Sequence, residues 1–363
     1  MAKKKNTPFF GHIKHFVAML FLGANLFTLF LLWICCATTW VYLPAYPRMG
    51  TVGLAFPIFL VLNLLFIPLW LIYKPRMLVV PIVGMALCGG YILDYFPLNF
   101  GHTQDEPELT VMTWNTSNMT LYGADSLHFA TDYVVNSGAD VIFLQEHLPE
   151  TAKFHAMNDT LRARGYHIDY RKGRTIITRF PILSIDTLKA STSLSNGILR
   201  ADLQYQDDTL TVFCVHLESN KLSFDDKSEY GEAIKSPEQK RIKHEVGYLG
   251  HKIGAASTYR AQQAKALLNT LDSLPDGRSV LVCGDFNDTP ISYAYQKINR
   301  RLDNAFRHKG RGVGVTYNER FFPIRIDHIF YSSDWQCTEV HIEQSMMASD
   351  HYPVVARLKK RQK

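Results

Sequence analysis

The chain has 363 residues, of which 47% are hydrophobic and 20% are charged, and its formal net charge is +6. The first 100 residues hold seven Lys and Arg and a single acid, Asp94, so the rest of the chain carries 32 basic and 32 acidic residues. Proteins that hold polynucleotides non-specifically usually carry a basic excess, so this neutral balance argues against a general nucleic-acid surface. The six cysteines show no C-x-x-C spacing, which argues against a zinc or disulfide framework.

Three long uncharged stretches occupy the first 100 residues. We predict transmembrane helices over residues 16–37, 52–71 and 77–93, because about 20 apolar residues cross the hydrocarbon core of a bilayer. The third stretch is short and contains Pro81, Gly84, Gly89 and Gly90. A cleaved signal peptide is the alternative for the first stretch, but its apolar core is too long and two more stretches follow. We therefore expect a membrane anchor over residues 1–100 and a catalytic domain over residues 101–363.

Loop charges predict how this anchor is oriented. Four lysines precede the first stretch, and Lys74 and Arg76 lie between the second and the third, whereas only Arg48 lies between the first and the second. The positive-inside rule therefore places the amino terminus in the cytoplasm. Three spans would make this a multi-pass protein of the cytoplasmic (inner) membrane with an extracytoplasmic catalytic domain. If the third stretch does not cross, that domain is cytoplasmic.

Beyond the anchor, strand-like and helical patterns alternate loosely. Helical spacing predicts helices over residues 127–137, 151–164 and 259–274. Runs rich in Val, Ile and Phe predict strands over residues 198–204, 210–216, 279–285, 326–331, 337–342 and 353–358. This order fits a two-sheet α/β sandwich. A long polar stretch, residues 220–257, is either a solvated surface excursion or a substrate-selecting loop, since long insertions at strand ends often carry function.

Polar side chains follow several of the strand-like runs directly. Acids, amides and imidazoles at the ends of buried strands point into a crevice at the edge of the sheet, where α/β folds bind ligands. Such a set suggests one site that binds a divalent cation and hydrolyses a phosphate ester. Its candidate members are Asn115, Glu146, His216, Asp285, Asn287, Asp327, Asp350 and His351.

The segments that carry these residues resemble, in order, those of the endonuclease/exonuclease/phosphatase family, the DNase I-like superfamily. They read Asn, Gln-Glu, His-Leu, Gly-Asp-Phe-Asn, a late-strand Asp and Ser-Asp-His, and they extend over residues 109–358. One such motif recurs by chance, but all six in order form a strong signal. The resemblance implies a DNase I-like two-sheet α/β sandwich and a metal-dependent hydrolase of ester bonds.

The resemblance also implies a metal site. Hard oxygen ligands suit Mg²⁺ or Mn²⁺, which bind through one or two carboxylates and keep several waters. Glu146 is the expected first ligand, with Asn115 beside it. Asp350 is expected either to be a further ligand or to orient an imidazole.

The remaining residues have catalytic roles by the same resemblance. Asp285 is expected to deprotonate the attacking water, and Asn287 to hydrogen-bond a phosphoryl oxygen. His351 is expected to donate to a non-bridging oxygen. His216 is expected near the leaving group, with Asp327 as its orienting partner.

Three functions remain open from the sequence. The first is a membrane-anchored phosphoesterase that acts on a lipid headgroup or a small phosphoester, with the lipid bilayer as a partner and no obligate protein partner evident. The second is a nuclease with the same site, which predicts a steep salt dependence. The third is a catalytically silent binding protein, which would have been free to lose the polar set.

Overall fold

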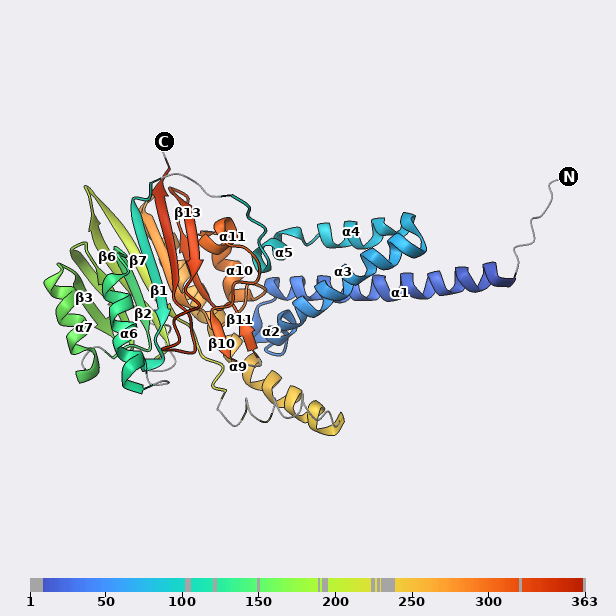
Figure 1. Ribbon diagram of the computed structural model, residues 1–363, viewed down its shortest axis with the longest axis horizontal. Coiled ribbons are helices and arrows are strands. Elements are labelled where there is room, and N and C mark those ends of the chain that lie inside the picture. Colours follow the sequence, from blue (N-terminus) through green and yellow to red (C-terminus); the bar gives the residue numbers. More distant parts are fainter. Residues whose placement is uncertain are drawn as a thin grey trace.

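A computed structural model describes residues 9–101, 106–119, 123–148, 151–188, 190, 195–222, 226, 229, 239–319 and 322–361. Figure 1 shows a sandwich of strands and helices at one end of the molecule and a group of apolar helices that extends away from it. The predicted stretch 220–257 lies partly outside the described residues.

The apolar helices are α1 (Phe9–Ala37), α3 (Phe56–Tyr73), α4 (Val79–Ala86) and α5 (Gly89–Tyr95). Two spans in this region, His12–Trp40 and Met49–Tyr73, are long and apolar enough to cross a membrane. The third predicted stretch is a pair of helices bent by 69°. The bend lies at Leu87 and Cys88, which form a turn between the two helices. Two adjacent glycines, Gly89 and Gly90, follow this turn, and glycine is a weak helix former.

The surface of these helices has the polarity expected of lipid-facing helices. Large apolar side chains such as Phe16, Leu20 and Phe27 are exposed. Polar groups instead lie between the helices, where Asn25 Nδ2 donates to Asn63 Oδ1 at 3.0 Å and Trp70 Nε1 donates to Asn25 Oδ1 at 3.1 Å. Interhelical hydrogen bonds of this kind hold helices together where lipid removes the hydrophobic drive.

The rest of the chain forms two six-stranded sheets. The first sheet has the order β13-β14-β1-β2-β4-β3 and the second β5-β6-β7-β8-β12-β9. The first contains β1 (Leu109–Asn115), β2 (Val141–Gln145), β3 (His167–Arg171), β4 (Arg174–Thr178), β13 (Trp335–Ile342) and β14 (Val354–Lys360). The second contains β5 (Ile182–Thr187), β6 (Gly197–Tyr205), β7 (Asp208–His216), β8 (Ser279–Asp285), β9 (Asp303–Asn304) and β12 (Asp327–Tyr331). A short hairpin of β10 (Tyr317–Glu319) and β11 (Phe322–Ile324) lies apart from both sheets in the pairing.

The sheets pack face to face, and helices cover their outer faces (Figure 1). Side chains such as Val111, Phe143, Val212 and Ile329 fill the space between the sheets. The helices α6 (Gly123–Asn136) and α7 (Ala152–Ala163) pack on the first sheet, and α9 (Gln239–Asp272) and α10 (Tyr293–Asn299) pack on the second. The predicted α/β sandwich is confirmed.

One predicted helix is much longer than its sequence pattern indicated. We expected a helix over residues 259–274, but α9 begins at Gln239. Its additional turns lie within the polar stretch 220–257, whose alternating charges and glycines concealed them. Figure 1 shows this first half extending beyond the sandwich, on the side where the apolar helices leave it.

The anchor contacts the sandwich at two places. The first contact involves Trp40, which lies in the loop after α1. The guanidinium of Arg300, a residue of the sandwich, lies 3.4 Å from the centre of the Trp40 ring. At the end of α5, Asp94 pairs with Arg307 at 3.0 Å and accepts from Gln296 Nε2 at 2.7 Å. The loop that follows α1 and the end of α5 therefore both lie at the sandwich.

Strand register brings the polar strand ends together. In the first sheet, β1 and β2 are parallel and pair Asn115 with Gln145, the residue before Glu146. In the second sheet, β7 and β8 are parallel and pair His216 with Asp285. Asp285 also lies opposite Asp327, because β12 runs antiparallel to β8. Side chains from five separate segments therefore meet at one edge of the sandwich.

Candidate active site

Asp285 lies at the centre of this edge, with its side chain 1% exposed. Its Oδ2 accepts from Asn115 Nδ2 at 3.0 Å and from Asn287 Nδ2 at 3.2 Å, and its Oδ1 accepts from the Asn287 backbone N at 2.7 Å. A Cβ on Gly284 would lie 1.9 Å from the Val215 carbonyl oxygen, which explains why glycine precedes the acid. Asn287 has a φ of 50°, a strained value that turns its amide back toward Asp285.

The electrostatic surroundings of Asp285 favour its protonated form. Burial and the neighbouring Asp327 carboxylate raise the pKa of Asp285 to about 6, against the opposing effect of His351 and His216. A carboxyl group with such a pKa can exchange a proton near neutral pH.

His351 is held by Asp327. Its Nδ1 lies 2.9 Å from Asp327 Oδ2, and its Nε2 faces Asp285 Oδ2 at 3.9 Å. Burial works to lower the pKa of His351, but the carboxylates of Asp327 and Asp285 outweigh burial and raise the pKa to about 10. The imidazole is therefore positively charged at neutral pH and can donate a hydrogen bond to an anionic oxygen.

The backbone around His351 is fixed from the first sheet. Trp114 Nε1 donates to the His351 carbonyl oxygen at 2.9 Å. Ser349 Oγ donates to the Asn115 carbonyl oxygen at 2.8 Å and accepts from the His351 backbone N at 3.1 Å. The serine of the Ser-Asp-His segment therefore connects the end of β1 to His351, a role that the sequence analysis did not assign.

The predicted pairing of Asp327 with His216 is wrong, since Asp327 contacts His351 instead. His216 Nδ1 lies 3.1 Å from the Ser195 carbonyl oxygen, so this nitrogen carries the proton that it donates there. His216 Nε2 then faces the acids, 3.6 Å from Glu146 Oε1 and 3.7 Å from Asp285 Oδ2. A backbone carbonyl orients this imidazole, and such a partner has no sequence signature.

Glu146 is the most accessible acid of the site, with its side chain 36% exposed. Asn115 Nδ2 donates to Glu146 Oε1 at 3.3 Å, while Asn115 Oδ1 accepts from the Ser117 backbone N at 3.0 Å. An accessible carboxylate beside an amide fits a hard divalent cation that keeps several waters. The predicted neighbours Asn115 and Glu146 therefore lie together.

Asp350, the third predicted metal residue, has contacts of its own beside this pair. Its Oδ1 accepts from Ser349 Oγ at 3.4 Å and its backbone oxygen accepts from Asn318. Across the residues that the structure describes, one group of acidic and imidazole side chains has the spacing to hold an ion, namely Asp285, Asp327 and His351. The hydrogen bond between His351 and Asp327 already occupies two of its ligand atoms, so we assign this group to proton handling.

A cavity of about 530 Å³ opens over Glu146 and His216. Several of its lining residues had no signal in the sequence, because they lie in turns and loops without a motif. They are Asn118, Lys172, Ser195 and Asn196. Ser219 and Lys221 also line the cavity, and Lys221 lies at the start of the stretch 220–257 that was predicted either as a surface excursion or as a substrate-selecting loop. Lys221 Nζ pairs with Glu218 Oε1 at 2.9 Å, whereas Lys172 is exposed at the turn between β3 and β4.

Other ionisable residues near the motifs have structural roles. His147 Nδ1 lies 2.9 Å from Thr175 Oγ1, and His328 packs against Phe286 and Tyr295. The buried Arg260 bonds Asp288 at 2.9 Å. It also donates to the Glu218 carbonyl oxygen, to Asn220 and to Ser257, so it fastens the segments after β7 and β8 to α9.

The fold and site define a DNase I-like hydrolase that acts on phosphoester bonds. The chain belongs to the endonuclease/exonuclease/phosphatase family, whose model matches residues 112–351. Enzymes of this family depend on a divalent metal. A second model, described as a domain of unknown function, matches residues 18–95.

Two solved structures share the fold at low sequence identity. The human Nocturnin catalytic domain with bound sulfate has a TM-score of 0.51 and 15% identity, over 72% of this chain and 97% of its own. D. rerio TDP2 complexed with single strand DNA product has a TM-score of 0.50 and 18% identity, over 69% and 99%.

A curated relative matches a shorter part of the chain. The YbhP protein of Escherichia coli (strain K12) is 29% identical over 109 residues, which are 29% of this chain and 43% of YbhP. The match thus spans less than half the length of that relative.

Proposed function

We propose that this protein is a membrane-anchored, divalent-metal-dependent phosphoesterase that hydrolyses a phosphoester on a lipid headgroup or a small molecule. The observation that carries the proposal is the buried Asp285, held by two amides and faced by the Nε2 atoms of His216 and His351. This arrangement fits hydrolysis by water attack, because a base, amide donors and a cationic imidazole converge on one edge of the sandwich.

Each residue has a role in this proposal. Asp285 takes a proton from the attacking water, and Asn287 orients Asp285. Asn287 Nδ2 donates to Asp285 Oδ2 and to the Leu217 carbonyl oxygen, and it would exchange one of these bonds for a bond to a phosphoryl oxygen of the substrate. His351, kept protonated by Asp327, donates to a non-bridging oxygen, and His216 lies near the leaving oxygen.

Mg²⁺ or Mn²⁺ is the proposed cofactor. Glu146 would hold it, with Asn115 beside Glu146 and Asp350 as a further candidate ligand. The bound ion would neutralise negative charge on the phosphate. Binding through the Asn115 oxygen requires that its amide turn, since its nitrogen faces the two acids.

The contacts of the anchor support an extracytoplasmic catalytic domain. The loop after α1 and the end of α5 both contact the sandwich, through Trp40 and Asp94. The bent pair α4–α5 therefore returns to the side from which α3 started, opposite the amino terminus and the loop with Lys74 and Arg76. Because basic loops remain in the cytoplasm, the sandwich lies outside the cytoplasmic membrane.

A nuclease with the same site is the second candidate. The solved D. rerio TDP2 complex contains single strand DNA product, and two lysines line the cavity above Glu146. The equal numbers of basic and acidic residues after residue 100 argue against a nuclease, because proteins that bind polynucleotides usually carry a basic excess. The complete catalytic set argues against a silent binding protein.

The test is a substrate panel on the full chain in detergent micelles, with Mg²⁺ or Mn²⁺ against EDTA. The panel contains DNA, RNA, phosphodiester and phosphomonoester chromogens, and phospholipid and sphingolipid vesicles. We expect metal-dependent cleavage of lipids or small esters that Asp285→Asn abolishes. Cleavage of DNA or RNA instead would favour the nuclease, and a fully active Asp285→Asn variant would refute the assigned site.

A further inference from the structure

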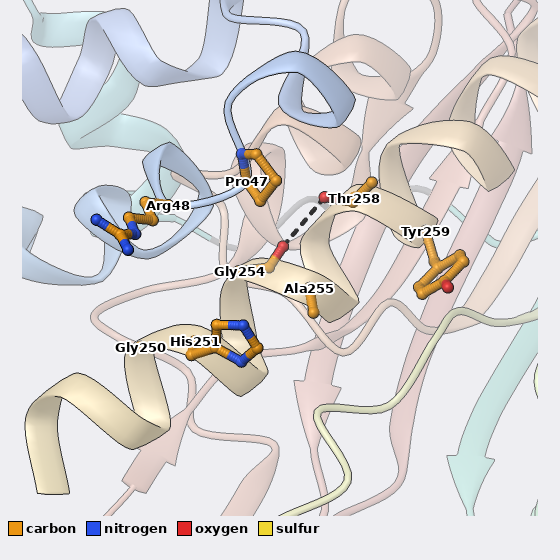
Figure 2. A pocket seen from close by; sticks show the side chains of 8 residues that line it. All are labelled: Pro47, Arg48, Gly250, His251, Gly254, Ala255, Thr258 and Tyr259. Atoms are coloured by element: carbon orange, nitrogen blue, oxygen red, sulfur yellow. Dashed lines mark hydrogen bonds between the residues drawn. The ribbon is translucent and has the colours of Figure 1, made fainter.

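A second cavity lies between the loop that joins α1 to α3 and the helix α9. Its volume is about 270 Å³. Pro47 and Arg48 line it from the loop, and His251, Gly254, Ala255 and Tyr259 line it from α9. Figure 2 shows Arg48 and His251 on one side of these residues and Tyr259 on the other.

The loop and the helix come very close at this cavity. A Cβ on Gly254 would lie 2.8 Å from the Pro47 carbonyl oxygen, so only glycine allows the loop to approach the helix here. The small side chain of Ala255 follows on the same helix and is exposed. The cavity is therefore bounded by backbone and small side chains, with cationic and imidazole groups at its side.

The position of the cavity relates it to the membrane. The loop connects the two spans that are long and apolar enough to cross a bilayer. Its aromatic side chains Trp40, Tyr42 and Tyr46 are 63%, 44% and 64% exposed. Exposed tryptophan and tyrosine at the end of a span mark the level of the lipid headgroups.

The charge of the cavity suits an anion. Arg48 is the one charged residue between residues 41 and 55. Among the residues that the structure describes, no carboxylate pairs with Arg48 or with His251. An exposed arginine at headgroup level without a carboxylate partner attracts the phosphate of an anionic lipid, and the guanidinium fork suits a phosphate.

We propose that this cavity binds the phosphate-bearing headgroup of an anionic membrane lipid, with Arg48 and His251 as the polar contacts. The site is distinct from the catalytic edge and steadies the sandwich on the bilayer through α9. The inference rests on the membrane anchor proposed above and not on the reaction.

The experiment uses the full chain, purified in micelles that contain an equimolar mixture of phosphatidylglycerol and phosphatidylcholine. Native mass spectrometry counts the lipids that remain bound. We expect the wild type to retain phosphatidylglycerol preferentially, and Arg48→Gln to reduce that preference about fivefold, the effect of one arginine at the surface. Ala255→Leu fills the cavity without changing charge and should reduce the preference likewise.

The matched control is Arg162→Gln, which removes the same charge from the exposed end of α7, on the far side of the sandwich. Equal retention of phosphatidylglycerol in wild type, Arg48→Gln and Ala255→Leu would overturn the proposal. Complete displacement of the lipid by inorganic phosphate would also overturn it, because the site would then recognise a free anion. Failure of the anchor itself would appear separately, as release of the full chain from membranes by alkaline carbonate.

Discussion

The two sheets contribute unlike halves to the active site. The second sheet supplies Asp285 and Asp327, which are almost completely buried and hydrogen-bonded within the protein. The first sheet supplies Glu146, whose side chain is about one-third exposed at the base of a cavity. The buried half contains Asp285, whose raised pKa of about 6 suits proton transfer, and the open half has the accessible oxygen that a hydrated cation needs.

This contrast separates two kinds of defect. A change in the buried half should alter the chemical step and should not respond to added metal. A change in the open half should weaken the binding of metal or substrate. A higher concentration of that metal or substrate should then restore activity.

After the complete loss of activity expected of Asp285→Asn, the largest effect is expected from Asp327→Asn. The amide keeps a hydrogen bond to His351 but removes the charge that raises the pKa of its imidazole. We expect kcat at neutral pH to fall on the order of 10²- to 10⁴-fold, the range of general acid–base contributions. NMR titration of His351 should show its pKa falling well below 10. Normal kcat with the lowered pKa would remove His351 from the mechanism.

Glu146→Gln should have a smaller and different effect. We expect the concentration of Mg²⁺ needed for half-maximal activity to rise at least about 10-fold, because a neutral amide replaces a carboxylate ligand. Saturating Mg²⁺ should then restore much of kcat, whereas it should not restore Asp327→Asn. If metal does not rescue Glu146→Gln, the two halves are not functionally separate.

The pH profile tests the buried half in the unmodified protein. Asp285 must be ionised to accept a proton, so kcat/KM should fall below about pH 6, where this carboxyl becomes protonated. The expected slope is about tenfold per pH unit. His351 must be protonated to donate, so the alkaline limb should lie near pH 10. An acidic limb near pH 4 would mean that Asp285 has an ordinary pKa in the working enzyme.

The smallest effect is expected at the edge of the cavity. Lys172→Met removes an exposed charge that lines the opening above Glu146. We expect KM for an anionic substrate to rise about two- to fivefold with kcat unchanged, because exposed ion pairs contribute little. Lys265→Met on α9, which removes the same charge from an exposed lysine outside the cavity lining, is the control and should leave both constants unchanged. A fall in kcat would place Lys172 in the chemical step.

Much of the sandwich was predictable because buried strands leave a simple pattern. Residues 279–285 were predicted as a strand, and β8 has these bounds. Asn115, Glu146, His216 and Asp285 were expected at one edge, and strand register brings them there. The sequence could not supply the partner of each imidazole, because contacts between distant segments, such as His216 with the Ser195 carbonyl oxygen and His351 with Asp327, depend on how the sheets pack.

The anchor was harder to predict in detail. Composition located the apolar stretches, but α1 begins at Phe9 rather than near residue 16, and α3 spans Phe56–Tyr73 rather than residues 52–71. Apolar patterns do not mark helix ends, which depend on hydrogen bonding and on neighbouring loops. The contact between Trp40 and Arg300 joins residues 260 positions apart that belong to no motif. This contact can therefore be found only in the folded structure.

The two attachments of the anchor, at Trp40 and at Asp94, also limit how far the sandwich can move relative to the apolar helices. If the apolar helices cross a membrane as proposed, a sandwich fastened at both places cannot swing freely on a tether, and its catalytic edge would be held at one height above the bilayer. Substrates that cannot present their phosphate at that height would be excluded whatever their chemistry. The geometry of attachment would thus select substrates before any side chain of the active site meets them.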